Sequence, residues 1–530
     1  MSDIRSLIEE GRAALGIELG STRIKAVLVG EDYQVIASGD HEWENRLENG
    51  IWTYSEEDIW GGLRDCYANL VKDVEARCGI TPARYKAMGF SAMMHGYLAF
   101  DAEGKLLVPF RTWRNQITGQ AAKELSDAFR FNIPERWTVA HLRQAILNKE
   151  EHLARLSRVN TLAGYVHWKL TGEFVVGRGE GSGIFPLNDT TYDYDQALVE
   201  RFDEMTRESG YDFKLLDLIP SVLNAGENAG VLTEEGARLL DPTGKLEAGI
   251  PFCPPEGDAG TGMTATNSVR KKTGNVSAGT SVFSMVVLEK ALSSYYPEID
   301  MVTTPDGAPV AMVHCNNCTS DLNDWVGLFK EAFDLLGVPV DMNTLYGALY
   351  RNAMNGDPDV SGILSYNYVS GEHVTGIVDG RPLLVRTPDA DFSLANFMRA
   401  NLYSAFATLK CGNDILLQKE NVKVDCLNGH GGIFRTKGVA QQILADALSC
   451  PVAVLETAGE GGPWGMALLA AYMTDKEAGE TLPDFLSDRV FKDAASQIVQ
   501  PDPENAAAFD RFISRYRRGL AIEKAAGENL

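Results

Sequence analysis

The spacing of apolar positions along the chain switches repeatedly between a period of two and a period near 3.6, which predicts a mixed α/β fold. Near the N-terminus, Leu15–Leu19 and Lys25–Val29 are short runs typical of strands, and Gly20-Ser21-Thr22-Arg23 separates them. This pattern predicts a β-hairpin with a turn of small residues. The pattern of residues over Lys86–Ala92 predicts a further strand.

Helices are predicted after the first hairpin. Ser55-Glu56-Glu57-Asp58 resembles a capping box, and apolar residues then recur at helical spacing until Gly79. Residues 118–220 have the pattern of helices joined by loops rich in Gly, Asn and Asp. A last helix places apolar residues on one face, which we expect to pack on the protein rather than on a partner: Phe509, Phe512, Ile513, Tyr516 and Leu520.

The hairpin pattern recurs near the middle of the chain. Gly274–Val287 repeats the order of Gly16–Val29, in which a β-run is followed by Gly, small hydroxyl residues and a second β-run. Two such hairpins suggest two lobes of similar design, although hairpins of this composition are common enough for coincidence to stay an alternative. The Gly-rich stretch Gly257–Gly262 would allow a hinge, so we predict lobes at 1–262 and 263–530.

Composition and charge narrow the class of protein. The chain has 530 residues, of which 45% are hydrophobic and 23% charged, as in a soluble protein with large cores. Acidic residues outnumber basic ones, 73 to 49, and the net charge is −24. Such a surface repels phosphate backbones and anionic lipid, so we expect no nucleic-acid or membrane partner. Backbone N–H groups can still bind a small anion.

We expect a cytoplasmic protein. The first residues lack the basic and apolar regions of a secretion signal, and no apolar run reaches the roughly 18 residues that span a bilayer. The eight cysteines are scattered, and only Cys315-Asn-Asn-Cys318 has metal or redox spacing. Because a zinc ribbon would need a second pair, we expect reduced, structural thiols.

The common nucleotide and hydrolase motifs are missing. The sequence has no P-loop, no dinucleotide-binding Gly-x-Gly-x-x-Gly after an N-terminal strand and no Gly-x-Ser-x-Gly elbow. Instead, Gly20-Ser21-Thr22 and Gly279-Thr280-Ser281 are turns whose N–H groups and hydroxyls could surround phosphate. Each turn alone is best explained as a plain hairpin, whereas the pair favours a phosphate site.

Two side chains near strand ends could carry chemistry. Asp258 lies in Gly257-Asp258-Ala259-Gly260, after the predicted strand Ile250–Cys253. It could cap the following helix, or it could act as a general base toward a substrate hydroxyl. His95, in Met93-Met94-His95-Gly96, could hydrogen-bond a polyol or could be a structural histidine.

Taken in order, these segments resemble the FGGY carbohydrate kinases, which have the fold of the sugar kinase, actin and heat-shock ATPase superfamily. The resemblance covers about Leu15 to Tyr472 and implies two ribonuclease H-like lobes with a deep cleft between them. The matching segments are Gly16–Thr22, Ala92–Gly96, Arg111–Asn115, Leu170–Glu173, Gly257–Gly260, Ser277–Ser281, Ser370–Glu372, Gly431–Ile433 and Gln442–Asp446.

The resemblance also implies an activity and a site. It implies transfer of a phosphoryl group from ATP to a sugar, most closely a ketopentose as in xylulokinases and ribulokinases. Asp258 would be the general base, and Glu18 would support Mg²⁺, usually through water. The expected partners are ATP and the sugar, with a homodimer left open. The implied sugar contacts are Trp52, Met94, His95, Trp113, Asn115 and Asp258, and the implied ATP contacts are Gly20, Ser21, Thr22, Gly279, Thr280, Gly431 and Gly432.

Three departures set this chain apart from the family pattern. Glu18 stands where the family normally has Asp, which moves the charge outward by roughly 1 Å. Asn115 stands where xylulokinases tend to have Asp, and Pro-Pro-Glu-Gly before Asp258 lacks the usual small residues. Two alternatives therefore stay open: a kinase for another polyol or carbohydrate, and a sugar or nucleotide sensor of the same fold that has lost transfer.

Overall fold

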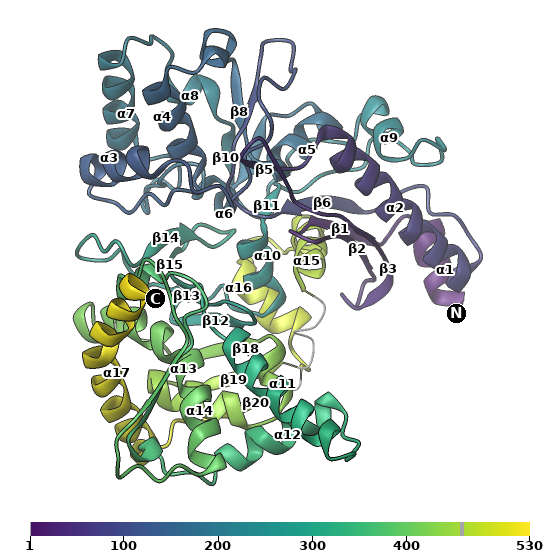
Figure 1. The fold of residues 1–530 in the computed structure, drawn as a ribbon. Helices are drawn as coiled ribbons and strands as arrows, with labels where there is room; N and C mark the ends of the chain where they lie inside the picture. Colours follow the sequence, from purple (N-terminus) through teal and green to yellow (C-terminus); the bar gives the residue numbers. More distant parts are fainter. Residues whose placement is uncertain (1, 456–460, 495) are drawn as a thin grey trace. The chain divides into compact units, whose positions relative to one another are not determined.

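The computed structural model describes residues 2–455, 461–494 and 496–530 (Figure 1). The chain forms two compact units. Residues 263–269 and two later segments lie beyond the predicted boundary after residue 262 and group with the first unit. The first unit comprises Met1–Val269, Met301–Val310 and Glu460–Asp493, and the second comprises Arg270–Asp300, Ala311–Gly459 and Ala494–Leu530.

The first unit is built on a five-stranded sheet of order β11-β6-β1-β2-β3. β1 pairs antiparallel with β2 and parallel with β6, so the predicted hairpin and the strand near Lys86–Ala92 are confirmed. The strands are β1 Ala14–Leu19, β2 Arg23–Val29, β3 Val35–Glu42, β6 Ala87–Ala92 and β11 Glu256–Gly257.

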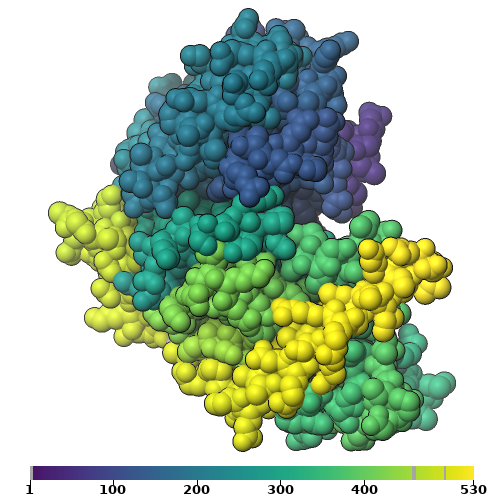
Figure 2. All heavy atoms as spheres, turned by 90° about the vertical axis from the view of Figure 1, so that its left-hand side faces the viewer, coloured from purple at the N-terminus to yellow at the C-terminus, as the bar shows by residue number. Residues whose placement is uncertain are grey.

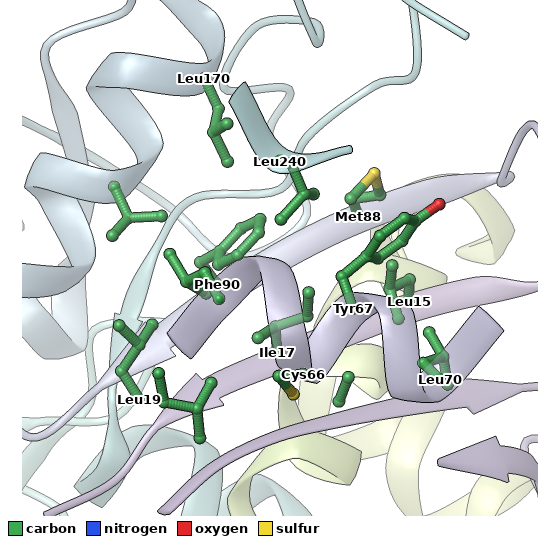
Figure 3. Packing of buried hydrophobic residues seen from close by; sticks show 14 of the residues in the cluster. Leu15, Ile17, Leu19, Cys66, Tyr67, Leu70, Met88, Phe90, Leu170 and Leu240 are labelled. Atoms are coloured by element: carbon green, nitrogen blue, oxygen red, sulfur yellow. The ribbon is translucent and has the colours of Figure 1, made fainter. Parts of the chain in front are cut away.

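Helices cover both faces of this sheet. α2 (Glu56–Cys78) begins with the predicted capping box on Ser55 and ends at Gly79, which is left-handed. Leu15, Ile17 and Leu19 of β1 point toward α2 and form the core with it (Figure 3). Because side chains alternate along a strand, Gly16 and Glu18 point to the other face. There α15 (Gly461–Asp475) packs on β1 and β6.

The close approach of α15 depends on Gly16, because a Cβ at that position would collide with the backbone of Pro463 and Ala467. The sequence predicts a Gly-rich turn at Gly459-Glu460-Gly461-Gly462 and a helix from Trp464, whereas α15 begins at Gly461. Of the Gly-rich turn predicted before it, Gly459 and Glu460 lie outside the described residues. This helix is buried almost throughout, which explains why a segment late in the chain groups with the first unit.

The rest of the first unit is mostly helical, as predicted for residues 118–220. Its further helices are α1 Ser2–Glu9, α3 Gly119–Phe129, α4 Thr138–Asn148, η1 Glu151–Arg155, α5 Leu162–Thr171, α6 Arg178–Gly181, α7 Gln196–Glu208, α8 Leu215–Leu218, α9 Glu234–Leu240, α10 Asp258–Ala265, α16 Leu482–Phe485 and η7 Leu486–Val490. Its small two-stranded sheets pair β4 Arg46–Glu48 with β5 Ile51–Thr53, β7 Leu98–Phe100 with β8 Arg158–Asn160, and β9 Val175–Gly177 with β10 Ser221–Leu223.

The second unit contains a sheet of order β14-β15-β13-β12-β18-β19-β20, in which β14 and the start of β15 carry the stretch that groups with the first unit. β12 pairs antiparallel with β13 and parallel with β18, which repeats the arrangement of β1 with β2 and β6. The predicted second hairpin is therefore confirmed. The strands are β12 Thr273–Ala278, β13 Val282–Val287, β14 Asp300–Thr303, β15 Pro309–Cys315, β18 Cys426–His430, β19 Val452–Leu455 and β20 Ser496–Val499, with β16 Ile363–Tyr366 and β17 Leu383–Arg386 forming a separate pair.

Helices also pack around this sheet. The outer side of α17 forms part of the surface in Figure 2. The helix buries Phe509, Phe512, Ile513 and Tyr516, which confirms the predicted packing face except at Leu520, which is only partly buried. The helices are α11 Ser320–Leu335, α12 Met342–Ala353, η2 Val360–Gly362, η3 His373–Thr375, α13 Leu394–Asp414, η4 Ile415–Lys419, η5 Gly432–Arg435, α14 Val439–Leu448 and α17 Pro503–Asn529.

Two expectations about the whole chain can be set against the structure. Cys315 and Cys318 are buried free thiols, as expected of structural cysteines. No group of three or more potential metal ligands from His, Cys, Asp and Glu lies among the described residues. In the same ranges, no helix is both long and apolar enough to cross a membrane.

Candidate active site

Glu18 lies where several segments of the first unit meet. Its Oε2 accepts hydrogen bonds from the Ser91 hydroxyl at 3.4 Å and from the Thr261 hydroxyl at 3.3 Å. Gly462, in the first turn of α15, lies directly against the same carboxylate, and a Cβ at that position would collide with it. β1, β6, α10 and α15 thus all contribute to the surroundings of this one side chain.

Asp258 is the first residue of α10, and Gly257 rather than Asp258 occupies the N-cap position. The simple capping role considered from the sequence is therefore wrong. The Asp258 Oδ1 accepts the backbone N–H of Met94 at 3.1 Å, and the side chain is open to solvent. The carboxylate is held on one oxygen and is accessible, as a proton acceptor must be.

Glu18 and Asp258 influence each other electrostatically. Burial, and then the charge of Asp258, raise the pKa of Glu18 to about 7. The surrounding protein also raises the pKa of Asp258, while the N–H groups of Met94 and Ala259 and the charge of Arg136 lower it. A divalent cation beside Glu18 would offset this repulsion, and the Ser91 and Thr261 hydroxyls supply further oxygen atoms there.

His95 combines burial with an unusual backbone conformation. Its φ of 73° lies in the left-handed region, which a residue other than glycine adopts at a cost of roughly 1–3 kcal/mol. The imidazole stacks on Trp137 with the ring centroids 5.9 Å apart, and its Nδ1 lies 3.3 Å from the carbonyl oxygen of Gly183. The ring is thus fixed in position next to Met94, whose backbone holds Asp258.

The other predicted sugar contacts form a second group. Trp113 is 39% exposed, and its indole N–H donates to the Ser21 hydroxyl at 3.2 Å. Asn115 is buried, and its amide accepts the N–H of Trp52 at 2.9 Å and donates to the carbonyl of Trp52 at 2.8 Å. Asn115 therefore fixes the backbone of Trp52, whose ring lies 4.0 Å from the Arg114 guanidinium carbon.

The residues Gly20–Thr22, here called the first turn, connect β1 to β2. Trp43 donates its indole N–H to the carbonyl of Gly20 at 2.7 Å, and Tyr54 donates its hydroxyl to the carbonyl of Ser21 at 2.6 Å. The two aromatic rings stack with their centroids 4.1 Å apart. Thr22 is exposed and lines an open cavity of about 840 Å³ that also includes Arg23, Lys25, Glu42, Trp43 and Glu44.

The residues Gly279–Ser281, the second turn, connect β12 to β13 in the second unit. The backbone N–H of Thr319 donates to the carbonyl of Gly279 at 3.1 Å, and that of Cys318 donates to the carbonyl of Thr280 at 3.0 Å. Gly431 lies directly against Ala278 with a φ of 113°, a combination that excludes a side chain. Gly432 is exposed beside it, so the predicted nucleotide contacts Gly279, Thr280, Gly431 and Gly432 lie near one another.

Sequence reasoning missed several residues of these surroundings. Tyr54 and Trp43 support the first turn, and Arg136 acts on Asp258, without any local pattern that marks them. Glu180 and Glu256 are fully buried near Asp258. Only Glu256 carried a signal, since it belongs to the Pro-Pro-Glu-Gly departure.

Comparison with known proteins agrees with this arrangement in both units. Residues 13–263 match the N-terminal domain of the FGGY family of carbohydrate kinases, and residues 274–474 match its C-terminal domain. The chain belongs to the FGGY family of carbohydrate kinases. A xylulose kinase of Haemophilus influenzae is 21% identical to this FGGY kinase over 521 residues, 96% of this chain and 99% of that protein.

Solved structures show the same fold. A xylulose kinase from Lactobacillus acidophilus has a TM-score of 0.78 at 16% identity, covering 97% of this chain and 99% of that one. A gluconate kinase from the same organism also has a TM-score of 0.78, at 15% identity, covering 98% and 99%. The protein is thus an ATP-dependent carbohydrate kinase with the two-domain α/β fold of the actin-like ATPases.

Proposed function

We propose that this FGGY kinase transfers the terminal phosphoryl group of ATP to a hydroxyl of a ketopentose or a close relative, with Asp258 as general base. The observation that carries the proposal is the Asp258 carboxylate, held by the Met94 N–H and open to solvent beside His95. The full-length similarity to a xylulose kinase supports a ketopentose as the substrate.

The hydrogen bonding of Asp258 leaves one carboxylate oxygen available to accept a proton. Oδ1 accepts the Met94 N–H, which leaves Oδ2 for the substrate hydroxyl. When the hydroxyl oxygen attacks phosphorus, its proton passes to the carboxylate. Since the protein atoms around the carboxylate raise the pKa of Asp258, it is a better proton acceptor than an ordinary aspartate.

The two units would supply different groups to this reaction. In the first unit, Gly20, Ser21 and Thr22 would bind phosphate, and His95, Met94, Trp113 and Trp52 would contact the sugar, with Asn115 acting through Trp52. In the second unit, Gly279 and Thr280 would bind phosphate, while Gly431 and Gly432 would leave room for the adenosine. Small residues at each turn permit close approach of the phosphates.

Glu18 would hold Mg²⁺, most simply through water. The mutual repulsion of Glu18 and Asp258 supports a cation at this place, and Ser91 and Thr261 would orient the carboxylate. A metal that keeps several waters needs few protein ligands. When bound with ATP, the ion would neutralise part of the phosphate charge.

A sugar acid is a second candidate substrate. Arg114 lies over the Trp52 ring, and Asn115 has no charge. The proposed sugar contacts therefore carry more positive charge than they would with aspartate at position 115. The structural likeness to a gluconate kinase agrees with this candidate.

The experiment is a screen of sugar-dependent ADP release with wild type and Asp258→Asn. The substrates are ketopentoses, ketohexoses, glycerol, pentitols and aldonates. We expect a ketopentose to give the highest kcat/KM and Asp258→Asn to abolish most of the turnover. Preference for glycerol, a hexose or an aldonate would contradict the substrate, whereas ATP binding without turnover of any sugar would favour a sensor.

A further inference from the structure

Glu256 is a buried carboxyl that the proposed reaction does not use. It lies in β11, directly before Gly257 and Asp258, and its side chain is almost completely buried. Its two oxygens accept the backbone N–H groups of Gly179 at 3.3 Å and Glu180 at 2.9 Å, both in the short helix α6. A carboxyl from the strand before the base is thus bonded to the backbone of a different segment.

Two glycines of a neighbouring segment leave space for this carboxyl. A Cβ at Gly177 or at Gly179 would collide with the oxygens of Glu256, so the side chain occupies the space that two glycines leave open. This explains the departure of Pro-Pro-Glu-Gly from the small residues that are usual before the base. The larger residue at 256 is accommodated by the missing side chains at 177 and 179.

Glu180 lies against the same turn. Its side chain is fully buried, and a Cβ at Gly257 would lie 2.6 Å from its Oε2. Burial raises the pKa of Glu180 well above the ordinary value and that of Glu256 to about 8. The carboxyls therefore act here mainly through shape and hydrogen bonds, because burial disfavours their charged forms.

We propose that Glu256 is a positioning residue for the catalytic base. Its carboxyl connects the turn Gly257–Asp258 to α6 and so keeps Asp258 at hydrogen-bond distance from the Met94 N–H. The pairing of β11 supports the same role. Glu256 and Gly257 pair with Ser91 and Ala92 of β6, the strand that leads directly into Met94 and His95. The inference rests on the proposed role of Asp258.

The expected effect follows from geometry. Without the Glu256 carboxyl, two buried N–H groups lose their acceptor and a cavity opens behind Gly257, so the start of α10 can shift. A misplacement of about 1 Å at a reacting group can cost roughly 100-fold in rate. Nucleotide contacts of the second unit are untouched, so we expect the loss to fall on kcat rather than on the KM for ATP.

Three substitutions test this inference in the full-length chain. Glu256→Gln keeps the length of the side chain and one acceptor oxygen, Glu256→Asp keeps the acid but shortens its reach, and Glu256→Ala removes both. We expect kcat to fall in that order, by less than about tenfold for Gln and by roughly 10- to 100-fold for Asp and Ala. The KM for ATP should stay within about twofold of the wild-type value, as expected when only the geometry of the base changes.

Glu523→Ala is the matched control. Glu523 is also fully buried and accepts a backbone N–H, that of Arg381 at 2.6 Å, but it lies in α17 of the second unit. Glu523→Ala should lower the melting temperature without a loss of kcat comparable to that of Glu256→Ala. If Glu256→Ala does not fold, the kcat values of Glu256→Gln and Glu256→Asp test the inference without it.

The outcomes separate this inference from the proposed function. A folded Glu256→Asp with kcat equal to or above that of Glu256→Gln would overturn the inference, as would a kcat loss of the same size in Glu523→Ala. In either case Asp258→Asn would still be inactive. An active Asp258→Asn, in contrast, would overturn the proposed role of the base itself.

Discussion

The first and second turns have the same backbone plan and different supports. Each links two antiparallel strands through three residues, Gly-Ser-Thr in one and Gly-Thr-Ser in the other. In the first turn, two aromatic side chains bond the carbonyls. In the second, backbone N–H groups of the loop after β15 do so.

The second loop is itself held by a buried carboxyl. Glu372 accepts the backbone N–H of Asn316 at 2.8 Å and that of Asn317 at 3.3 Å, and this loop continues into Cys318 and Thr319 at the second turn. Both arrangements bond carbonyl oxygens to donors of the protein. N–H groups bind a phosphate and carbonyl oxygens repel it, so the two turns would meet the same requirement of the proposed phosphate sites in two ways.

The difference predicts where mutations will act. Tyr54 and Trp43 support the proposed phosphate turn of the unit that also carries Asp258 and His95, so changes there should alter transfer of the phosphoryl group to the sugar. Glu372 belongs to the unit that carries Gly431 and Gly432, so changes there should alter the use of ATP. Five predictions test this division, in order of decreasing effect.

The largest effect is expected for Asp258→Asn, which should separate the chemistry of the first unit from nucleotide binding by the second. Loss of a general base costs roughly 10²–10⁴ in turnover. Binding of ATP, measured by calorimetry, should stay close to the wild-type value. A variant with more than half of the wild-type kcat would show that Asp258 is not the base.

Glu18→Gln should weaken the response to magnesium, because a charge is lost where the proposed ion would be held. Groups that act on a metal through an outer shell typically contribute 10- to 100-fold to affinity or activity. Titration of activity with Mg²⁺ at saturating ATP measures this change. An unchanged magnesium dependence would leave Glu18 with a purely structural role between β1 and α15.

His95→Ala should raise the KM for the best sugar by roughly tenfold or more, while the KM for ATP changes little. The reason is that a substrate hydroxyl would lose its partner in a site of the first unit only. His95→Asn is a useful second variant, because asparagine tolerates the φ of 73° better than alanine. Equal changes in both KM values would contradict the division between the two turns.

Much of this site could be predicted from the sequence. The two hairpins, the Asp258 segment and both turns are local patterns of apolar spacing and small residues. The hydrogen bond from the Met94 N–H to Asp258 was not visible, because those two residues come from distant parts of the chain.

The remainder depends on packing between distant segments. Asn115 matched a family position for a sugar contact, yet its amide is bonded to the backbone of Trp52. Glu256 departed from the family pattern, and only the structure shows that Gly177 and Gly179 leave space for it. A sequence pattern reports which residues are unusual, whereas the compensating residues appear only in the folded chain.

The pH dependence of the stability of Glu372→Gln tests the role of Glu372 in supporting the second turn. Burial raises the pKa of Glu372 to about 7, above the ordinary 4.5, although N–H groups of Asn317 and Asn316 lower it. Between these values the folded state holds a proton that the unfolded state has lost, so stability falls as pH rises. The Nδ1 atom of His373 lies 3.7 Å from Oε1 of this carboxyl.

The expected slope from this group is at most about 1.4 kcal/mol per pH unit. Urea unfolding of wild type and Glu372→Gln at pH 5 and pH 7.5 measures it, and the variant should show a smaller decline. Glu372→Ala should in addition raise the KM for ATP more than that for the sugar. Parallel pH profiles of wild type and Glu372→Gln would show that this carboxyl does not titrate in that range.

The smallest effect is expected for Tyr54→Phe, which removes one donor from the first turn and leaves the stacked ring in place. A single neutral hydrogen bond contributes roughly 0.5–1.5 kcal/mol, so kcat/KM for the sugar should fall by less than about tenfold. Tyr67→Phe is the control, because its hydroxyl bonds that of Tyr85 at 3.1 Å within the core and away from the turn. If both variants lose stability equally and Tyr54→Phe keeps full kcat/KM, the aromatic support of the first turn serves folding alone. A selective loss in Tyr54→Phe would instead show that the orientation of the Ser21 carbonyl matters for the reaction, as the comparison of the two turns requires.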